Sequence, residues 1–166
     1  MKKDELLQIL LFFVKLNLLA IPLYILLYIN FSYEPLQHLV TFLSYKILRA
    51  VGFELAMDKT RLIFAKGFEL NFVDIDMDCT GWKSLYALIA LTLATPSMSW
   101  KKKSIFLSIS LPSIFFFNIF RIVLCVYLSF LKPGLFYLIH DFLWKFGLIT
   151  AVLASWAFWL KYEKRI

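Results

Sequence analysis

Long apolar runs separated by short charged segments dominate the hydrophobic pattern of this chain. The first run, residues 6–29, has 24 residues. A helix of that length crosses a hydrocarbon core about 30 Å thick at 1.5 Å per residue. Three further runs cover residues 81–95, 104–131 and 136–160. The pattern predicts four transmembrane helices in a single integral-membrane domain formed by residues 1–166, with the first helix retained as an uncleaved span.

Residues 35–51 repeat with a helical period but are too polar to cross a membrane. Pro35 suits the first turn of a helix, and Gly52 offers a stop. We therefore expect an amphipathic helix that lies on the membrane surface or against the bundle. Its predicted apolar face consists of Leu36, Leu39, Val40, Leu43, Ile47 and Ala50, and its predicted polar face consists of Gln37, His38, Thr41, Ser44, Lys46 and Arg49.

The period changes to two in the segment that follows, which predicts a small β-hairpin over residues 60–76. Residues 65–67 are the expected turn. The apolar alternation shifts phase between Phe72 and Val73, as a β-bulge would require. The predicted fold class is an all-α polytopic membrane protein with about four transmembrane helices, one amphipathic helix and this extracytoplasmic hairpin.

The composition and charge support a location in the membrane. Of the 166 residues, 61% are hydrophobic and 19% aromatic, which is more apolar surface than a soluble domain of this size can bury. The net charge of +7 comes from basic residues scattered between the apolar runs, without the basic stripe typical of nucleic-acid binding. Four spans with both termini in the cytoplasm place Lys101–Lys103 and the basic C-terminus on the cytoplasmic side, in agreement with the positive-inside rule. We therefore expect a multi-pass protein of the cell membrane without a nucleic-acid partner.

An acidic alternation, Asp74, Asp76 and Asp78, leads directly into Cys79. Its D-x-D-x-D spacing is similar to the start of a calcium loop, but Cys79 replaces the required glycine and Leu85 the required glutamate. The aspartates are therefore interpreted as a solvated strand face. The two cysteines and two histidines show no metal-ligand spacing, so neither a metal nor another cofactor is expected.

Cys79 is the strongest candidate for chemistry. Thr80 can cap a helix that starts immediately afterwards, so the sulfur of Cys79 is expected near the positive end of a helix dipole, where a thiolate is favoured. A small buried side chain at a strand-to-helix turn is the alternative interpretation.

Arg121 lies inside the third predicted span, where a guanidinium is costly without a partner. The Cys79 thiolate or a substrate oxyanion could serve as its counter-charge. Asn118 and Cys125 share the helix face of Arg121 and could line the same cavity, although packing is the simpler role for Cys125. His140 lies near the outer start of the fourth span, at the membrane depth predicted for Cys79.

At these residues the chain resembles the exosortase/archaeosortase family of membrane-embedded cysteine transpeptidases. The matching pieces are Cys79–Gly81 at the start of one span, Asn118–Ile122 inside the next, and His140 with Gly147 in the last. The resemblance implies that Cys79 is the nucleophile, Arg121 its electrostatic partner and His140 the third active residue. Asn118, Thr80 and Gly81 would support the site or bind substrate.

The resemblance also implies a function. The chain would be an intramembrane cysteine protease or transpeptidase with its active site near the extracytoplasmic face. Its substrates would be exported proteins with a C-terminal tail made of a short motif, a hydrophobic helix and basic residues, and a membrane lipid is the expected acceptor. Two other classes stay open: a small transporter or channel, and a thiol redox protein that pairs Cys79 with Cys125.

Overall fold

The computed structural model describes residues 3–66, 69–96, 98–131 and 146–163. The chain divides into two compact units, and each is described by itself. Unit 1 contains Met1–Phe31, Lys83–Ile114 and Thr150–Ile166, and unit 2 contains Ser32–Trp82 and Phe115–Ile149.

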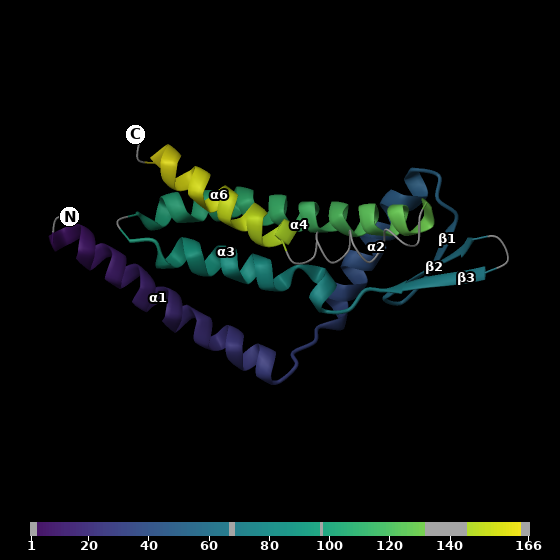
Figure 1. The fold of residues 1–166 in the computed structure, drawn as a ribbon, viewed down its shortest axis with the longest axis horizontal. Helices are drawn as coiled ribbons and strands as arrows, with labels where there is room; N and C mark the ends of the chain where they lie inside the picture. The colour runs from purple at the N-terminus through teal and green to yellow at the C-terminus, as the bar shows by residue number, and fades with distance from the viewer. Residues whose placement is uncertain (1–2, 67–68, 97, 132–145, 164–166) are drawn as a thin grey trace. The chain divides into compact units, whose positions relative to one another are not determined.

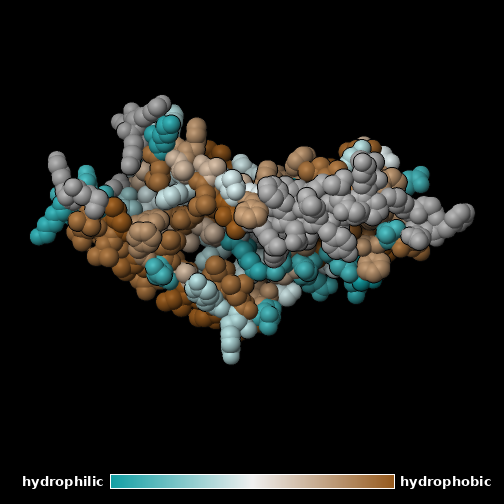
Figure 2. Space-filling model, viewed as in Figure 1, coloured by the Kyte–Doolittle hydropathy of each residue, from teal (hydrophilic) through white to brown (hydrophobic). Residues whose placement is uncertain are grey.

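Unit 1 is built from apolar helices (Figure 1). They are α1 (Lys3–Tyr28), most of α3 (Trp82–Ala94), the first part of α4 (Trp100–Leu131) and most of α6 (Leu148–Glu163). Within this unit, the start of α1, the α3–α4 connection and the end of α6 lie at the same end (Figure 1). The side chains of α1 are unburied despite its apolar sequence, and Figure 2 shows a largely hydrophobic surface over this helix. A bilayer would cover such a surface.

Two of the predicted spans form helices that are long and apolar enough to cross a membrane, namely α1 and α4. The described helices of the other two are shorter. The 13 residues of α3 extend about 20 Å at 1.5 Å per residue. In the fourth predicted span, residues 136–145 lie outside the described residues, and α6 has 16. Four complete membrane spans therefore stay a prediction.

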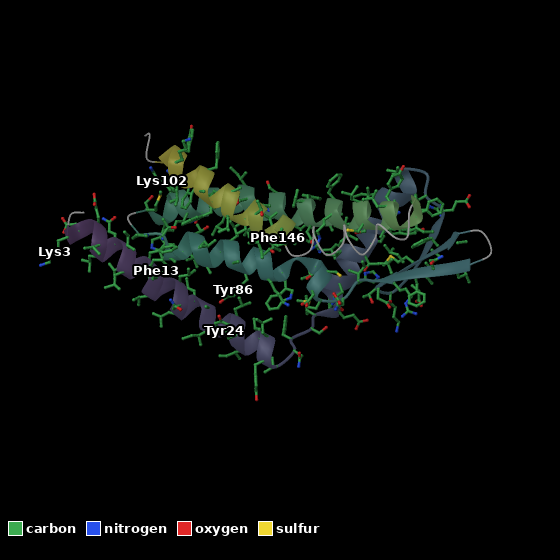
Figure 3. All side chains as sticks on the ribbon, in the orientation of Figure 1. Lys3, Phe13, Tyr24, Tyr86, Lys102 and Phe146 are labelled. Atoms are coloured by element: carbon green, nitrogen blue, oxygen red, sulfur yellow. The ribbon has the colours of Figure 1, made fainter. Side chains whose placement is uncertain are left out.

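Polar contacts join the helices of unit 1. The Tyr86 hydroxyl of α3 donates to the Leu19 carbonyl of α1 at 2.6 Å, and Figure 3 shows Tyr86 on the side of α3 that faces α1. The Trp156 indole N–H of α6 donates to the Thr95 hydroxyl at 3.1 Å. Lys103 is only 6% exposed, and its ammonium donates to the Leu93 carbonyl at 2.9 Å, which gives this charge a partner inside apolar surroundings.

Unit 2 contains a three-stranded antiparallel sheet in the order β1-β2-β3, formed by Leu55–Asp58, Arg61–Lys66 and Glu69–Asp74. The β2–β3 pair is the predicted hairpin, and β1 is an additional strand. Two details of the prediction are wrong. Ala65 and Lys66 pair with Leu70 and Glu69 inside the ladder, so the first two residues of the expected turn belong to β2. The pairing also runs without interruption past Phe72 and Val73, so the expected bulge is absent from this pair of strands.

The amphipathic helix α2 (Glu34–Ala50) forms where the pattern predicts it, but its buried face differs from the predicted one. Its buried residues are Val40, Thr41, Ser44 and Leu48, whereas Leu39 and Ile47 are exposed. The buried hydroxyl of Thr41 has a hydrogen-bond partner, because it donates to the Gln37 carbonyl one turn earlier at 2.8 Å. Small hydroxyl side chains thus occupy the face on which α2 packs.

The core of unit 2 joins α2, the inner face of the sheet and the second part of α4. It contains Val40, Leu48, Leu55, Leu62, Phe64, Ile75, Ile119, Ile122 and Val126. Ile75 directly follows β3, and Ile119 and Ile122 alternate along α4 with Asn118 and Arg121. This packing brings the end of the sheet, and therefore Cys79, against the polar residues of α4.

Candidate active site

Cys79 lies in the short 3-10 helix η1 (Asp78–Thr80), which connects β3 to α3. The backbone N–H of Cys79 points back to Asp76, and donates to its carboxylate Oδ1 at 2.9 Å and its carbonyl at 3.2 Å. The Thr80 side chain is fully buried and donates to the Met77 carbonyl at 2.7 Å. Its oxygen also accepts from the N–H of Trp82, the first residue of α3, at 3.4 Å. Thr80 therefore lies at the start of α3, as the sequence predicts, and fixes the backbone on both sides of the turn.

Gly81 is required by the backbone and by its surroundings. Its φ of +75° lies in the left-handed region that glycine adopts without steric cost. A Cβ at this position would also lie 2.9 Å from Cγ of Asn118. The glycine of the Cys-Thr-Gly segment therefore allows the turn before α3 and the close approach of α4.

Asn118 connects α4 to the nucleophile segment. Its side chain is 1% exposed, and its Nδ2 donates to the Cys79 carbonyl at 2.9 Å. The Cys79 backbone is therefore held at both ends, by Asp76 at its N–H and by Asn118 at its carbonyl. Oδ1 of Asn118 is buried and accepts no hydrogen bond from the part of the chain that the structure describes. The two predicted motifs, Cys79–Gly81 and Asn118–Ile122, are thus in direct contact.

Arg121 lies on α4 one turn after Asn118 and is 5% exposed. Its guanidinium interacts electrostatically with Cys79 and with Cys125. Cys125 is a free thiol, 8% exposed, one turn further along the same helix. The structure therefore places a buried cation beside the predicted nucleophile, within the same unit.

The expectation that the position of Cys79 favours a thiolate is wrong for this structure. Burial raises the pKa of Cys79 to about 12, and the negative charge of Asp76 acts in the same direction. The Arg121 guanidinium lowers this pKa, but by less. The physical reason is that Cys79 lies inside the 3-10 turn before α3, where an acidic side chain already occupies the free backbone N–H. The resting group is therefore a neutral thiol.

The interpretation of the three aspartates as a strand face holds for Asp74 but not for Asp76 or Asp78, which lie beyond the end of β3. Asp74 ends β3 and forms an exposed ion pair with Arg61, and this guanidinium holds the pKa of Asp74 below its ordinary value. Asp76 lies beyond the strand and caps the Cys79 turn. The D-x-x-C spacing carries a signal for this role, because an aspartate commonly accepts the backbone N–H of a nearby following residue.

His140 lies outside the described residues. Within the described ranges, no group of three or more His, Cys, Asp or Glu residues could hold a metal ion. A groove in unit 2 lies between the end of α2 and the sheet, with Arg49, Glu54, Ile63 and Leu70 among its lining residues. It includes none of the predicted site residues, so it is separate from the Cys79 site.

Apolar helices long enough for a bilayer and a half-buried cysteine beside a buried arginine define a membrane protein with a thiol-based candidate active site. Comparison with protein families matches the model of the transmembrane exosortases over residues 2–159. The chain therefore belongs to the transmembrane exosortase family, as its motifs indicate. No curated protein and no solved structure matches it.

Proposed function

We propose that this chain is an intramembrane cysteine transpeptidase that cleaves the C-terminal sorting signals of exported proteins and transfers them to a lipid anchor. Family membership supports a membrane transpeptidase or protease in general. The observation that carries the specific assignment is the contact of the two motifs: Asn118 donates to the Cys79 carbonyl, and the Arg121 guanidinium interacts electrostatically with Cys79.

The proposed reaction has two halves. Cys79 attacks a peptide carbonyl of the substrate and forms a thioester, while Arg121 stabilises the developing oxyanion. His140 protonates the departing amine, in the role that the family resemblance implies. An amine or hydroxyl acceptor on a lipid then resolves the thioester, and water would give simple hydrolysis instead.

The substrate tail in this proposal is a short motif followed by a hydrophobic helix and basic residues. Such a helix can enter the site laterally from the bilayer, and its basic end would stay in the cytoplasm. The scissile bond then lies near the extracytoplasmic face, where the charge pattern predicts the start of α3. A tail of this kind acts as a temporary membrane anchor that is cut off and replaced by a lipid.

A thiol comparison tests the proposal. The substrate is a reporter fused to a tail of this layout, taken from an exported protein encoded in the same genome. Cys79→Ser should abolish processing, because a hydroxyl without a dedicated base is far less nucleophilic than a thiol. Cys125→Ser is the matched control, and should keep most activity because it only replaces a buried packing group.

The same experiment distinguishes the other two classes. Equal loss in both variants, together with a disulfide between Cys79 and Cys125 in the oxidised protein, would favour a redox pair. Unchanged processing in Cys79→Ser would remove the transpeptidase assignment and leave the transporter class open.

A further inference from the structure

Asp76 contacts Cys79 in a way that the proposed mechanism does not use. Its carboxylate Oδ1 accepts the backbone N–H of Cys79 at 2.9 Å. The negative charge of the same carboxylate acts on the Cys79 thiol and raises its pKa. The Asp76 side chain is solvent-exposed, so it can exchange protons with water, whereas Cys79 is only partly exposed.

The reaction needs a proton acceptor at this position. Burial and the Asp76 charge raise the pKa of Cys79 to about 12, so the resting enzyme holds a thiol that must lose its proton when it attacks. Arg121 cannot take this proton, because a guanidinium is a donor without acceptor capacity. The Thr80 hydroxyl already donates to the Met77 carbonyl and the Asn118 amide to the Cys79 carbonyl.

We propose that Asp76 is a further catalytic residue, the general base that takes the proton from Cys79 Sγ as the sulfur attacks the substrate carbonyl. The inference rests on the proposed function, in which Cys79 is the nucleophile. It adds a carboxylate to the cysteine, arginine and histidine that the family resemblance implies.

The proton balance closes over one catalytic cycle. During acylation, the S–H bond breaks, its proton goes to the Asp76 carboxylate, and the new S–C bond forms. The peptide C–N bond then breaks, and the departing nitrogen takes a proton from His140. During deacylation, the acceptor gives its proton to His140 as it attacks the thioester. The sulfur leaves and recovers its proton from Asp76, so all groups return to their starting states.

Asp76→Asn tests this role with little disturbance of the fold, since the asparagine oxygen can still accept the Cys79 N–H. Two rates are measured on the purified protein: cleavage of the sorting-signal reporter and alkylation of Cys79 by iodoacetamide between pH 7 and 10, in a Cys125→Ser background. Cleavage should fall about a hundredfold to ten-thousandfold, the usual contribution of a general base. Alkylation at pH 8 should become faster, because removing the negative charge lowers the pKa of Cys79. At a pH below this pKa, each unit by which the pKa of Cys79 falls raises the thiolate fraction about tenfold.

Opposite changes in the two rates separate a base from a merely structural cap. Asp74→Asn is the matched control, because Asp74 pairs with Arg61 on the sheet, and it should change neither rate. Asp76→Ser is the second variant if Asp76→Asn does not fold, because a serine oxygen also caps a turn but carries no charge.

Three outcomes would overturn the inference. Cleavage within a few-fold of the unmodified protein would show that no carboxylate is needed. Parallel loss of cleavage and alkylation would show that Asp76 only shapes the turn, and unchanged alkylation would show that its charge does not act on the thiol. The first would leave the proposed function intact provided that Cys79→Ser is inactive. Full activity of Cys79→Ser would instead remove the proposed function itself.

Discussion

At the scale of single residues, the site is a set of backbone constraints on one cysteine. Asp76 and Asn118 hold the N–H and the carbonyl of Cys79, and Gly81 allows α4 to approach. The sequence draws attention to Arg121 and Asn118 because a polar residue inside an apolar span is conspicuous, and to Cys79 because it directly precedes a predicted helix. The protonation state of Cys79 could not, because it depends on burial and on a contact with Asp76 that the chain forms only when the turn closes.

The close approach at Gly81 predicts an energetic difference between two glycines. Gly52→Ala places a Cβ in open space at a φ of +88°, so it should cost only the left-handed strain of about 1–2 kcal/mol. Gly81→Ala adds the contact with Asn118 and should break the Asn118–Cys79 hydrogen bond, at a further cost of about 0.5–1.5 kcal/mol. Denaturant unfolding of the purified variants measures both values.

A double-mutant cycle isolates the contact. Asn118→Ser shortens the side chain, so Gly81→Ala combined with Asn118→Ser should destabilise the protein by less than the sum of the two single changes. Strict additivity would show that the glycine is needed only for its φ.

Arg121 carries a second prediction at this scale. Arg121→Lys should lose cleavage nearly as completely as Arg121→Ala, because a point ammonium cannot hold two acceptors in the planar geometry of a guanidinium. The loss of one oxyanion donor typically lowers the rate about a hundredfold to a thousandfold. Because the guanidinium lowers the pKa of Cys79, iodoacetamide should alkylate Cys79 more slowly at pH 8 in the alanine variant.

A structural arginine would behave differently. Its replacement would lower the yield of folded protein, while the folded fraction kept its cleavage rate and its alkylation profile. That result would take Arg121 out of the active site.

At the scale of elements, the sequence predicts where α1, α2 and the β2–β3 hairpin form. It does not predict the third strand of the sheet or the buried face of α2. The strand β1 has four residues, too few for a clear alternation. The buried face of α2 was misassigned because Thr41 and Ser44 count as polar in a periodic pattern. Their small side chains nevertheless allow close packing, and Thr41 can bond the preceding turn of its own helix.

The contact between α3 and α1 predicts an effect on folding stability that does not involve the active site. The Tyr86 hydroxyl of α3 donates to the Leu19 carbonyl of α1, three residues before Pro22. Tyr86→Phe should therefore lower the unfolding free energy in detergent by about 0.6 kcal/mol, the measured average for such bonds between membrane helices, and by no more than about 1.7 kcal/mol. Tyr24→Phe is the control, since Tyr24 is 69% exposed and should leave stability unchanged. A larger loss in the control than in Tyr86→Phe would contradict the assignment.

At the scale of the whole molecule, the charge pattern predicts a membrane orientation. We expect the sheet outside the cytoplasm and the Lys101–Lys103 cluster inside it. Single cysteines are introduced at Lys59, in the turn before β2, or at Lys101, in a background with Cys79→Ser and Cys125→Ser. In intact cells, an impermeant thiol reagent should label the cysteine at position 59 and spare that at position 101. The reverse pattern would turn the proposed active site towards the cytoplasm, where exported substrates would not meet it.

If Cys79 forms the covalent intermediate of a transpeptidation, mass spectrometry of the enzyme during turnover should detect it. The protein is mixed with the sorting-signal reporter, quenched in acid and digested. The peptide containing Cys79 should gain the mass of the reporter's acyl fragment, hydroxylamine should remove this mass as expected of a thioester, and Cys125→Ser should still form it. Reporter cleavage at the ordinary rate by Cys79→Ala, or an acyl adduct on any other residue, would contradict this role of Cys79.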